Sequence, residues 1–343
     1  MMDESIITLS RAAPHFLTEV HDRGINVIRI IQSVQSPALT FFMRSVSALG
    51  TEYFYIFAGL FIFWCLSAKK GFRLGLLIIV SGWINGFLKI LFNQPRPYEF
   101  YPELGLAFEP TRGFPSGHAQ MSMSFIIAIA FYLSINKTCK KFRPLIWIAA
   151  VFAVLLMGLS RLYLGVHFPT DLFGGWITAA IILVSFYFLE KPAAAFFIEK
   201  GKRFQLIFTA AAALVMNGLH PADIGLSALF LGFCAGYSIL INNFPFALAN
   251  NGTGKHFCLL LRMLRFIPGT IGAAAIFFGL RLILPGEDSV FHDIQFLEPY
   301  YDLGRFLRYG LFGLWASGGA PRVFMNLGLA PNETPAVQNS GDE

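Results

Sequence analysis

The stretch "LIWIAAVFAVLLMGLSRLYLGVHFPTDLFGGWITAAIILVSFYFL", residues 145–189, consists of two long apolar runs separated by a short polar segment. Each run approaches the length of about 20 residues that a helix needs to cross a membrane. Between them, Arg161, His167 and Asp171 fall within eleven residues. A charged group at the centre of a bilayer costs about 2.5–3.5 kcal/mol on insertion scales. These three side chains therefore either meet the membrane surface by chance or belong to a functional site.

The composition of the whole chain agrees with a membrane protein. Of its 343 residues, 55% are hydrophobic and 13% are charged, and the mean hydropathy is +0.60. A soluble domain usually carries about 25% charged residues. We therefore predict an all-α fold, a polytopic transmembrane helix bundle. The net charge of +6 is typical of cytoplasmic loops, and we expect no nucleic-acid partner.

Apolar runs predict about nine membrane spans. They lie at residues 51–66, 74–92, 120–135, 145–159, 172–189, 204–216, 224–241, 266–284 and 306–320. Before them, Ile25, Ile28, Ile31 and Val34 form one stripe, which is typical of a helix lying in the membrane interface. We accordingly expect four parts. They are an interfacial segment at 1–45, a catalytic helical core at 46–190, additional transmembrane helices at 191–320 and a flexible tail at 321–343.

The distribution of positive charge predicts the orientation in the membrane. Lysine and arginine residues gather in four loops, at residues 69–73, 137–143, 191–203 and 255–265. With about nine spans, all four loops fall on one side, which should be cytoplasmic together with the C-terminus. The polar segments 93–118 and 161–170 then fall on the extracytoplasmic side, where charged groups meet water.

Two further polar motifs lie on that same side. The first is "KILFNQPRP", residues 89–97, in which Lys89 and Arg96 are seven residues apart, or about two helical turns. Its prolines should end the preceding helix. The second is "GFPSGHA", residues 113–119, in which Ser116 and Gly117 lead into an apolar helix. Ser116 can cap that helix, whose first amide groups bind anions well, and His118 would lie in its first turn.

Together these residues suit a phosphoryl group. Lys89, Arg96 and Arg161 can neutralise its oxygens. Asp171 follows His167 by four residues, so its carboxylate can hold one imidazole N–H and aim the other nitrogen as a nucleophile. His118 would be the general acid that protonates the leaving oxygen. No cluster with metal-ligand spacing accompanies the motifs, and we expect no metal or other cofactor.

Each of these residues also has a purely structural explanation. Lys89 could be a lysine that reaches toward the interface from a span end, and Arg161 could be an interface anchor. Ser116 could be only a helix cap, and His118 only a polar helix start. Asp171 could be a carboxylate favoured by the helix dipole. The functional interpretation depends on their joint pattern, because independent accidents need not share one side of the membrane.

The motifs "K-x6-RP", "PSGH" and "SR-x5-H-x3-D" resemble the three signature blocks of the type 2 phosphatidic acid phosphatase (PAP2) superfamily. The resemblance covers about residues 74–189, and the triple block is specific, although "PSGH" alone would not be. It implies a metal-independent phosphatase with a PAP2-type helical core and a phosphohistidine intermediate on His167. It also implies His118 as the acid, and a phosphate site formed by Lys89, Arg96, Ser116, Gly117, His118 and Arg161.

The same constellation binds vanadate in related haloperoxidases, but those are soluble proteins, which this composition argues against. The extra spans after residue 190 are similar to the arrangement in glucose-6-phosphatase, and sphingosine-phosphate phosphatases also have a long C-terminal extension. The motifs bind only phosphate, so they do not choose between these branches.

We therefore expect an integral membrane phosphatase that cleaves a phosphomonoester or pyrophosphate from a phosphorylated lipid on the extracytoplasmic side. Two alternatives stay open. One is a phosphotransferase, in which an alcohol resolves the phosphohistidine. The other is a lipid transporter or scramblase that uses the site only for binding, although binding alone needs no aimed nucleophile. The sequence does not indicate an oligomeric state.

Overall fold

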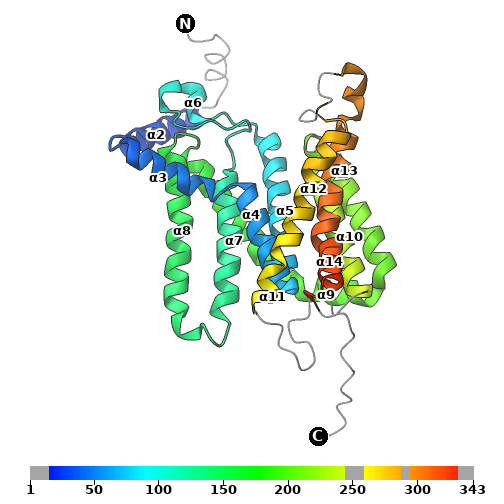
Figure 1. The fold of residues 1–343 in the computed structure, drawn as a ribbon. Coiled ribbons are helices and arrows are strands. Elements are labelled where there is room, and N and C mark those ends of the chain that lie inside the picture. Colours follow the sequence, from blue (N-terminus) through cyan, green and yellow to red (C-terminus); the bar gives the residue numbers. More distant parts are fainter. Residues whose placement is uncertain (1–14, 244–258, 287–289, 291–293, 331–343) are drawn as a thin grey trace. The chain divides into compact units, whose positions relative to one another are not determined.

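The computed structural model describes residues 15–243, 259–286, 290 and 294–330. These residues form helices, turns and loops, with no β-strand among them (Figure 1), so the all-α prediction is confirmed. The α-helices are α2 (His15–Gln32), α3 (Pro37–Ala48), α4 (Glu52–Phe61), α5 (Ala68–Phe92), α6 (Pro97–Phe100), α7 (Gly117–Ser134), α8 (Arg143–Tyr163), α9 (Pro169–Leu219), α10 (Ile224–Asn243), α11 (Leu259–Leu264), α12 (Phe266–Ile283), α13 (Tyr301–Leu314) and α14 (Ala320–Asn326). Short π- or 3₁₀-helical segments lie at Ile62–Leu66, Pro102–Leu104, Lys140–Phe142, Pro221–Asp223, Gln295–Tyr300 and Trp315–Gly319.

The chain forms two compact units. Unit 1 comprises residues 1–55 and 84–187, and unit 2 comprises residues 56–83 and 188–343. Helices α4, α5 and α9 each begin in one unit and end in the other. All eight residues of the predicted site belong to unit 1.

In unit 1, helices α7 and α8 lie side by side, and α2, α3 and α6 lie near one end of that pair (Figure 1). Ile25 and Ile28 of the predicted stripe are buried in a cluster with Leu104 and Phe168. Val34, at the end of the stripe, is exposed. The apolar face of α2 therefore packs on protein at these two isoleucines, and a position of the segment in the membrane interface stays a prediction.

Local sequence explains where the helices around the site begin and end. Helix α5 ends at Phe92, shortly before Pro95, because proline cannot continue the hydrogen-bonded ladder. Helix α8 is followed by Gly165, whose φ of 68° favours glycine. A Cβ atom at Gly165 would also lie 1.9 Å from the carbonyl oxygen of Leu104. Glycine is therefore required at this turn both by backbone conformation and by the close approach of another segment.

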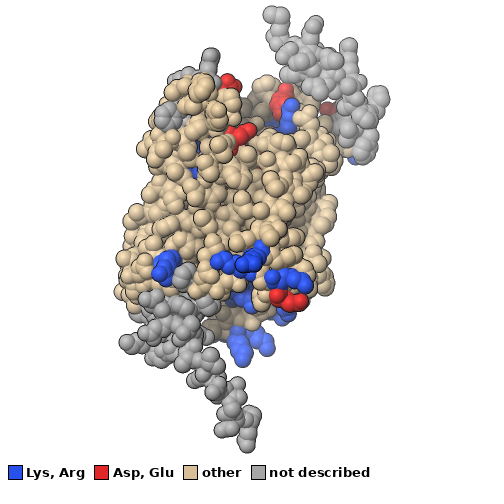
Figure 2. Space-filling view, turned by 90° about the vertical axis from the view of Figure 1, so that its right-hand side faces the viewer, with Lys and Arg blue, Asp and Glu red and all other residues tan. Residues whose placement is uncertain are grey.

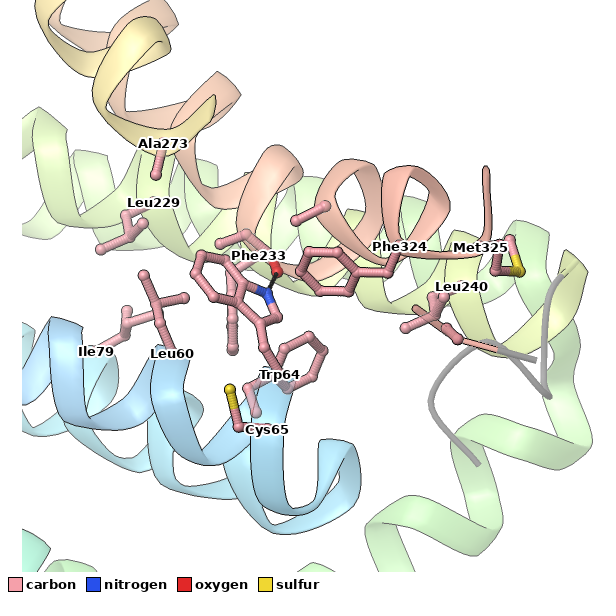
Figure 3. Packing of buried hydrophobic residues seen from close by; sticks show 14 residues of the cluster. Leu60, Trp64, Cys65, Ile79, Leu229, Phe233, Leu240, Ala273, Phe324 and Met325 are labelled. Atoms are coloured by element: carbon pink, nitrogen blue, oxygen red, sulfur yellow. Dashed lines mark hydrogen bonds between the residues drawn. The ribbon is translucent and has the colours of Figure 1, made fainter. Parts of the chain in front are cut away.

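Unit 2 has an apolar core around Trp64, Phe233 and Phe324 (Figure 3). The indole N–H of Trp64 donates to the carbonyl oxygen of Ala316 over 2.8 Å, so its polar atom is satisfied inside the core. Helices α10 and α13 approach closely, since a Cβ atom at Gly232 would lie 1.9 Å from the backbone oxygen of Gly310. Small residues at helix contacts are typical of membrane bundles.

Five helical segments in the described part of the chain are long and apolar enough to cross a membrane. They are Ala68–Phe100, Lys140–Tyr163, Pro169–Leu219, Pro221–Asn243 and Leu259–Ile283. A sixth candidate is the pair α3 and α4, which is bent by 53°. The multi-pass character is confirmed, whereas the number of nine spans stays a prediction.

The fifth and sixth predicted spans both fall within α9, a segment of 51 residues. It is interrupted at Gly201, which has a φ of 74° and a ψ of 177°. The interruption separates the two predicted runs. At the other end of the chain, helix α14 continues to Asn326, within the segment expected to be a tail, and Phe324 there is buried. Residues 331–343 of that segment lie outside the described residues.

Charged side chains are unevenly distributed on the face drawn in Figure 2. Lysine and arginine side chains gather toward the lower end of that face, and a broad, mostly uncharged surface lies above them. A wide uncharged surface bordered by basic residues is typical of a protein embedded in lipid.

Candidate active site

His167 lies in the turn between α8 and α9, and Asp171 lies in the first turn of α9. The Nδ1 atom of His167 is 3.2 Å from Oδ2 of Asp171, as expected from their spacing. The same carboxylate oxygen accepts the backbone N–H of Phe168 over 2.9 Å. Both side chains are about 1% exposed as residues. The carboxylate therefore fixes the imidazole and also satisfies an amide group at the start of the helix.

Arg96 lies against the other imidazole nitrogen. Its Nη1 atom is 3.3 Å from Nε2 of His167 and donates to the carbonyl oxygen of Val166 over 2.8 Å. Its Nε and Nη2 atoms donate to the carbonyl oxygens of Thr111 and Arg112, over 2.6 and 3.2 Å. The guanidinium group is thus anchored by backbone atoms beside the nitrogen that the carboxylate leaves free.

Arg161 projects from the last turn of α8 and is 1% exposed. Its Nη1 atom donates to the hydroxyl of Ser47, and its Nη2 atom forms an ion pair with Glu109. Its Nε–H group has no hydrogen-bond partner among the residues that the structure describes. The side chain of Glu109 is 26% exposed, so this partner can turn toward water and release the guanidinium group.

Lys89 and Ser116 bring the two other motifs to the same place. The ammonium group of Lys89 donates to the carbonyl oxygen of Arg112. Ser116 is the N-cap of α7, as predicted, and its hydroxyl accepts from the amide of Ala119 over 3.4 Å. The backbone N–H of Ser116 donates to the carbonyl oxygen of Asp171 over 3.0 Å. The start of α7 is therefore joined directly to the start of α9.

Gly117 packs against a buried amide side chain. A Cβ atom at Gly117 would lie 3.0 Å from Oδ1 of Asn85. The Nδ2 group of Asn85 donates to the carbonyl oxygen of Pro115 over 3.2 Å and to Oε1 of Gln120 over 2.9 Å. The loop that carries the "PSGH" motif is thus held in place by a side chain of α5.

His118 lies in the first turn of α7. No hydrogen bond joins its ring to any other residue in the described part of the chain, and packing defines its position. The backbone of Gly50 lies close to the ring, since an added Cβ atom there would lie 2.5 Å from Cδ2 of His118 and 2.8 Å from the sulfur of Met157.

The charges of the site act on His167. Burial lowers its pKa well below the ordinary value of 6.5, and the charges of Arg96, Arg161 and Lys89 lower the pKa further, with a contribution from His118. All four of these groups therefore act on the same imidazole. The lowered pKa keeps the imidazole of His167 neutral, which is the form with a free electron pair.

The structure thus brings all eight predicted residues together, and it adds others that the sequence did not indicate. Glu109 contacts Arg161 from the loop between the first two motifs, but that loop also holds Glu99 and Glu103, so the sequence did not single out Glu109. Ser47 and Gly50 come from a segment far from the motifs, and nothing in their local sequence marks them. Among the described residues, no group of three or more His, Cys, Asp or Glu side chains could hold a metal ion.

Comparison with known proteins gives two family matches. Residues 70–194 match the PAP2 superfamily. Residues 224–332 match the PAP2 superfamily phosphatase, transmembrane extension. The first match contains the three motifs, and the second lies within unit 2.

Three curated relatives are similar to this chain. Phosphatidylglycerophosphatase B of Bacillus subtilis is 31% identical over 182 residues, which are 50% of this chain and 81% of that protein. A probable sphingosine-1-phosphate phosphatase of Dictyostelium discoideum is 29% identical, over 51% of this chain and 46% of that protein. The glucose-6-phosphatase catalytic subunit 1 of Bos taurus is 29% identical, over 50% of this chain and 54% of that protein.

The chain thus spans only about half the length of the last two relatives, but most of the Bacillus protein. The resemblance read from the motifs is confirmed by these matches. On this similarity and on its two matched regions, the chain belongs to the PAP2 superfamily of phosphatases and carries that superfamily's transmembrane extension.

Proposed function

We propose that this protein hydrolyses a phosphomonoester or pyrophosphate of a lipid at the extracytoplasmic face of its membrane, through a phosphohistidine on His167. One observation carries the proposal. His167 Nδ1 lies at the carboxylate of Asp171, and its Nε2 atom faces the guanidinium group of Arg96 at 3.3 Å. The nitrogen with the free electron pair therefore faces the place where the cations would bind a phosphoryl group.

In the first step, the electron pair on Nε2 of His167 forms a bond to phosphorus while the bond from phosphorus to the leaving oxygen breaks. His118 donates its proton to that oxygen, so the product leaves as a neutral alcohol or, from a pyrophosphate, as a phosphate. Asp171 holds the N–H on the far side of the ring and stabilises the positive charge that develops there.

In the second step, water attacks the phosphohistidine. His118 accepts a proton from this water, and the bond between phosphorus and Nε2 breaks and returns its electron pair to the nitrogen. Inorganic phosphate is released, and both histidines regain their starting protonation states. In a two-step displacement, the residue that acts as the acid in the first step is expected to act as the base in the second.

The charge that develops on the phosphoryl oxygens is neutralised by protein groups. Lys89, Arg96 and Arg161 supply permanent positive charge, and the first amide groups of α7, at Gly117 and His118, supply additional donors. Such a constellation supplies the electrostatic stabilisation that a divalent ion provides in many other phosphatases. Metal independence is therefore part of the proposal.

Two observations support a lipid substrate. The Bacillus and Dictyostelium relatives are named for phosphatidylglycerophosphate and sphingosine-1-phosphate. Three of the helices that carry site residues, α5, α8 and α9, are long and apolar enough to cross the bilayer, so a lipid substrate could reach the site from within the membrane. The bovine relative, named for glucose 6-phosphate, makes a soluble sugar phosphate the necessary control.

The decisive experiment measures phosphate release from a panel of substrates by the purified protein in detergent. The panel contains phosphatidylglycerophosphate, sphingosine 1-phosphate, a polyprenyl diphosphate and glucose 6-phosphate, each with and without a lipid alcohol as acceptor. We expect phosphate release from at least one lipid and none from the His167→Ala variant. Transfer to the alcohol without free phosphate would identify a phosphotransferase. Binding or transbilayer movement of lipid without any phosphate release would identify a transporter or scramblase.

The side of the membrane is tested by cysteine labelling in a background with the four native cysteines replaced by serine. Positive charge in the loops supports an extracytoplasmic site, with a cytoplasmic C-terminus. A cysteine at Glu103 should therefore react with an impermeant thiol reagent added to intact cells, and a cysteine at Thr138 should not. The reverse pattern would put the site in the cytoplasm.

A further inference from the structure

The bend between α3 and α4 lies outside the region that matches the PAP2 superfamily, which starts at residue 70. Two of its residues nevertheless contact the phosphatase site. We propose that Ser47 and Gly50 are positioning residues for the reaction, in which Ser47 orients Arg161 toward the phosphoryl group and Gly50 sets the position of the acid His118. The inference rests on the proposed function and extends its machinery to an N-terminal segment.

Ser47 acts on Arg161. It is 8% exposed, and its hydroxyl accepts a hydrogen bond from Nη1 of Arg161. The other terminal nitrogen pairs with Glu109, whose charge opposes phosphate binding. A hydroxyl, in contrast, is neutral. It can hold the guanidinium group in place while leaving its positive charge available to the phosphoryl oxygens.

Gly50 acts on His118. A Cβ atom at Gly50 would lie 2.5 Å from Cδ2 of His118, whereas non-bonded carbon atoms prefer about 3.5–4.0 Å. Only a hydrogen atom fits between this backbone and the imidazole edge. Because no described residue forms a hydrogen bond with the ring, this contact with the Gly50 backbone limits where the acid can stand.

The bend joins the two contacts into one rigid piece. The backbone N–H of Gly50 donates to the carbonyl oxygen of Ser47 over 2.8 Å. Helix α3 is itself attached to the rest of unit 1, since Thr40 shares a hydrogen bond of 2.8 Å with the hydroxyl of Tyr163. Arg44 also donates to the carbonyl oxygen of Leu106 over 2.7 Å. The bend is therefore held against the site from several sides.

The two residues should leave different kinetic signatures. Ser47 acts through a phosphate-binding group, so its loss should weaken binding equally for every leaving group. Gly50 acts through the acid, so its substitution should harm substrates whose leaving group needs a proton and spare those whose leaving group does not. A merely structural role of Gly50 would lower the rate on all substrates alike, and a merely structural role of Ser47 would lower kcat without a specific rise in KM.

The first test replaces Ser47 by alanine, with Ser45→Ala as the matched control. Ser45 lies in the same helix and bonds only to the carbonyl oxygen of Phe41. We expect S47A to raise KM and the inhibition constant of vanadate about tenfold, and S45A to change neither. In an Arg161→Lys background, S47A should raise KM and the vanadate inhibition constant by less than about a further twofold, because the two changes act on one interaction.

The second test replaces Gly50 by alanine, with Gly59→Ala as the matched control, since a Cβ atom at Gly59 meets nothing within 4 Å. On an alkyl phosphate we expect G50A to lower kcat about 100-fold, within the range of general acid catalysis. On a nitrophenyl phosphate the loss should be less than about tenfold. If G50A does not fold, G50A with Met157→Ala removes the second clash and should show the same split between the two substrates.

Thermal unfolding in detergent confirms that each variant is folded. An unchanged KM and vanadate constant in S47A, or a full tenfold addition to the Arg161→Lys change, overturns the assignment of Ser47. Equal losses on both substrates overturn the assignment of Gly50. His118→Ala is measured alongside. If that variant loses the same factor on both substrates, His118 is not the acid, and the assignment of Gly50 fails with it. The assignment of Ser47 is still tested by comparing S47A in the wild-type and Arg161→Lys backgrounds.

Discussion

Arg161 in unit 1 and Arg265 in unit 2 are both about 1% exposed, but they are bound in different ways. Arg161 donates to two side chains, those of Ser47 and Glu109. Arg265 donates to backbone carbonyl oxygens, those of Leu329 over 2.8 Å and Trp64 over 3.3 Å. Burial of a charge is costly in either place, so the position of each arginine must be explained by the interactions it makes.

The kind of partner supplies that reason. Carbonyl oxygens at helix ends lack partners within their own helix. Arg265 satisfies that of Trp64, near the end of Ile62–Leu66, and that of Leu329, in the turn after α14, which is a structural role. The partners of Arg161 are side chains, and one of them is a partly exposed carboxylate, which the proposed function requires to give way to a phosphate. A buried charge in a membrane protein therefore indicates a ligand site when its partners can be exchanged. The following predictions test this distinction.

The largest expected effect concerns two buried histidines, one in each unit. His167→Ala should abolish the phosphoenzyme and reduce turnover on the order of 10⁶-fold, as for other covalent nucleophiles. His220, which is 5% exposed in unit 2, is the matched control, and His220→Ala should keep most of the activity. Trapping with labelled substrate and steady-state assays measure both. Substantial turnover by His167→Ala would contradict the difference between the units.

The two arginines should separate activity from stability. Arg161→Ala should lower kcat/KM about 10²–10³-fold, the usual cost of losing a group that stabilises transition-state charge, with little change in Tm. Arg265→Ala should leave kcat/KM within about twofold and should destabilise the fold by about 1.5–3 kcal/mol, because charge-assisted bonds to carbonyls are lost. Kinetics and thermal unfolding in detergent measure both quantities. The distinction is wrong if both variants lose the same property.

The pH profile sharpens the comparison further. The lowered pKa of His167 means that its neutral, nucleophilic form persists below pH 6.5, so the acid limb of a bell-shaped kcat/KM profile should lie below that value. Arg161→Gln removes one of the charges that lower this pKa, so the limb should move to higher pH. Arg265→Gln should not move it. A shift to lower pH in the Arg161 variant would contradict the electrostatic account.

The smallest expected effect is that of metal removal. With positive charge supplied by Lys89, Arg96 and Arg161, activity should stay within about twofold after treatment with EDTA, whereas vanadate should inhibit. Phosphate release before and after chelation measures this. A complete loss of activity that added magnesium restores would mean that the three cationic side chains do not suffice for catalysis.

The sequence allowed the helical fold to be predicted, and the spacing of the motifs led to the expectation that eight residues lie together, as they do in the structure. The contact of His167 with Asp171 follows from a separation of one helical turn, and the end of α5 follows from its prolines. Ser47, Gly50 and Glu109 could not be predicted in the same way. Their contacts depend on how distant segments pack, and the residues Ser, Gly and Glu occur at many other positions with no such contact.

The arrangement of the apolar segments was also only partly predictable. Hydropathy distinguishes apolar runs from polar ones, but it does not show whether two runs are joined by a loop or by an interrupted helix, as at Gly201. Similarly, the stripe of Ile25 and Ile28 predicts a buried face but not what buries it. In the structure, Leu104 and Phe168 pack against these two isoleucines.

The carboxylate of Asp171 has a consequence for how this enzyme can evolve. One oxygen atom serves both the imidazole of His167 and the backbone amide that opens α9. Selection for the hydrogen bond at the start of α9 therefore also preserves the carboxylate that orients His167, the proposed nucleophile. A descendant that lost His118 or Lys89 would still carry the pair of His167 and Asp171, from which the proposed activity could be regained in few steps.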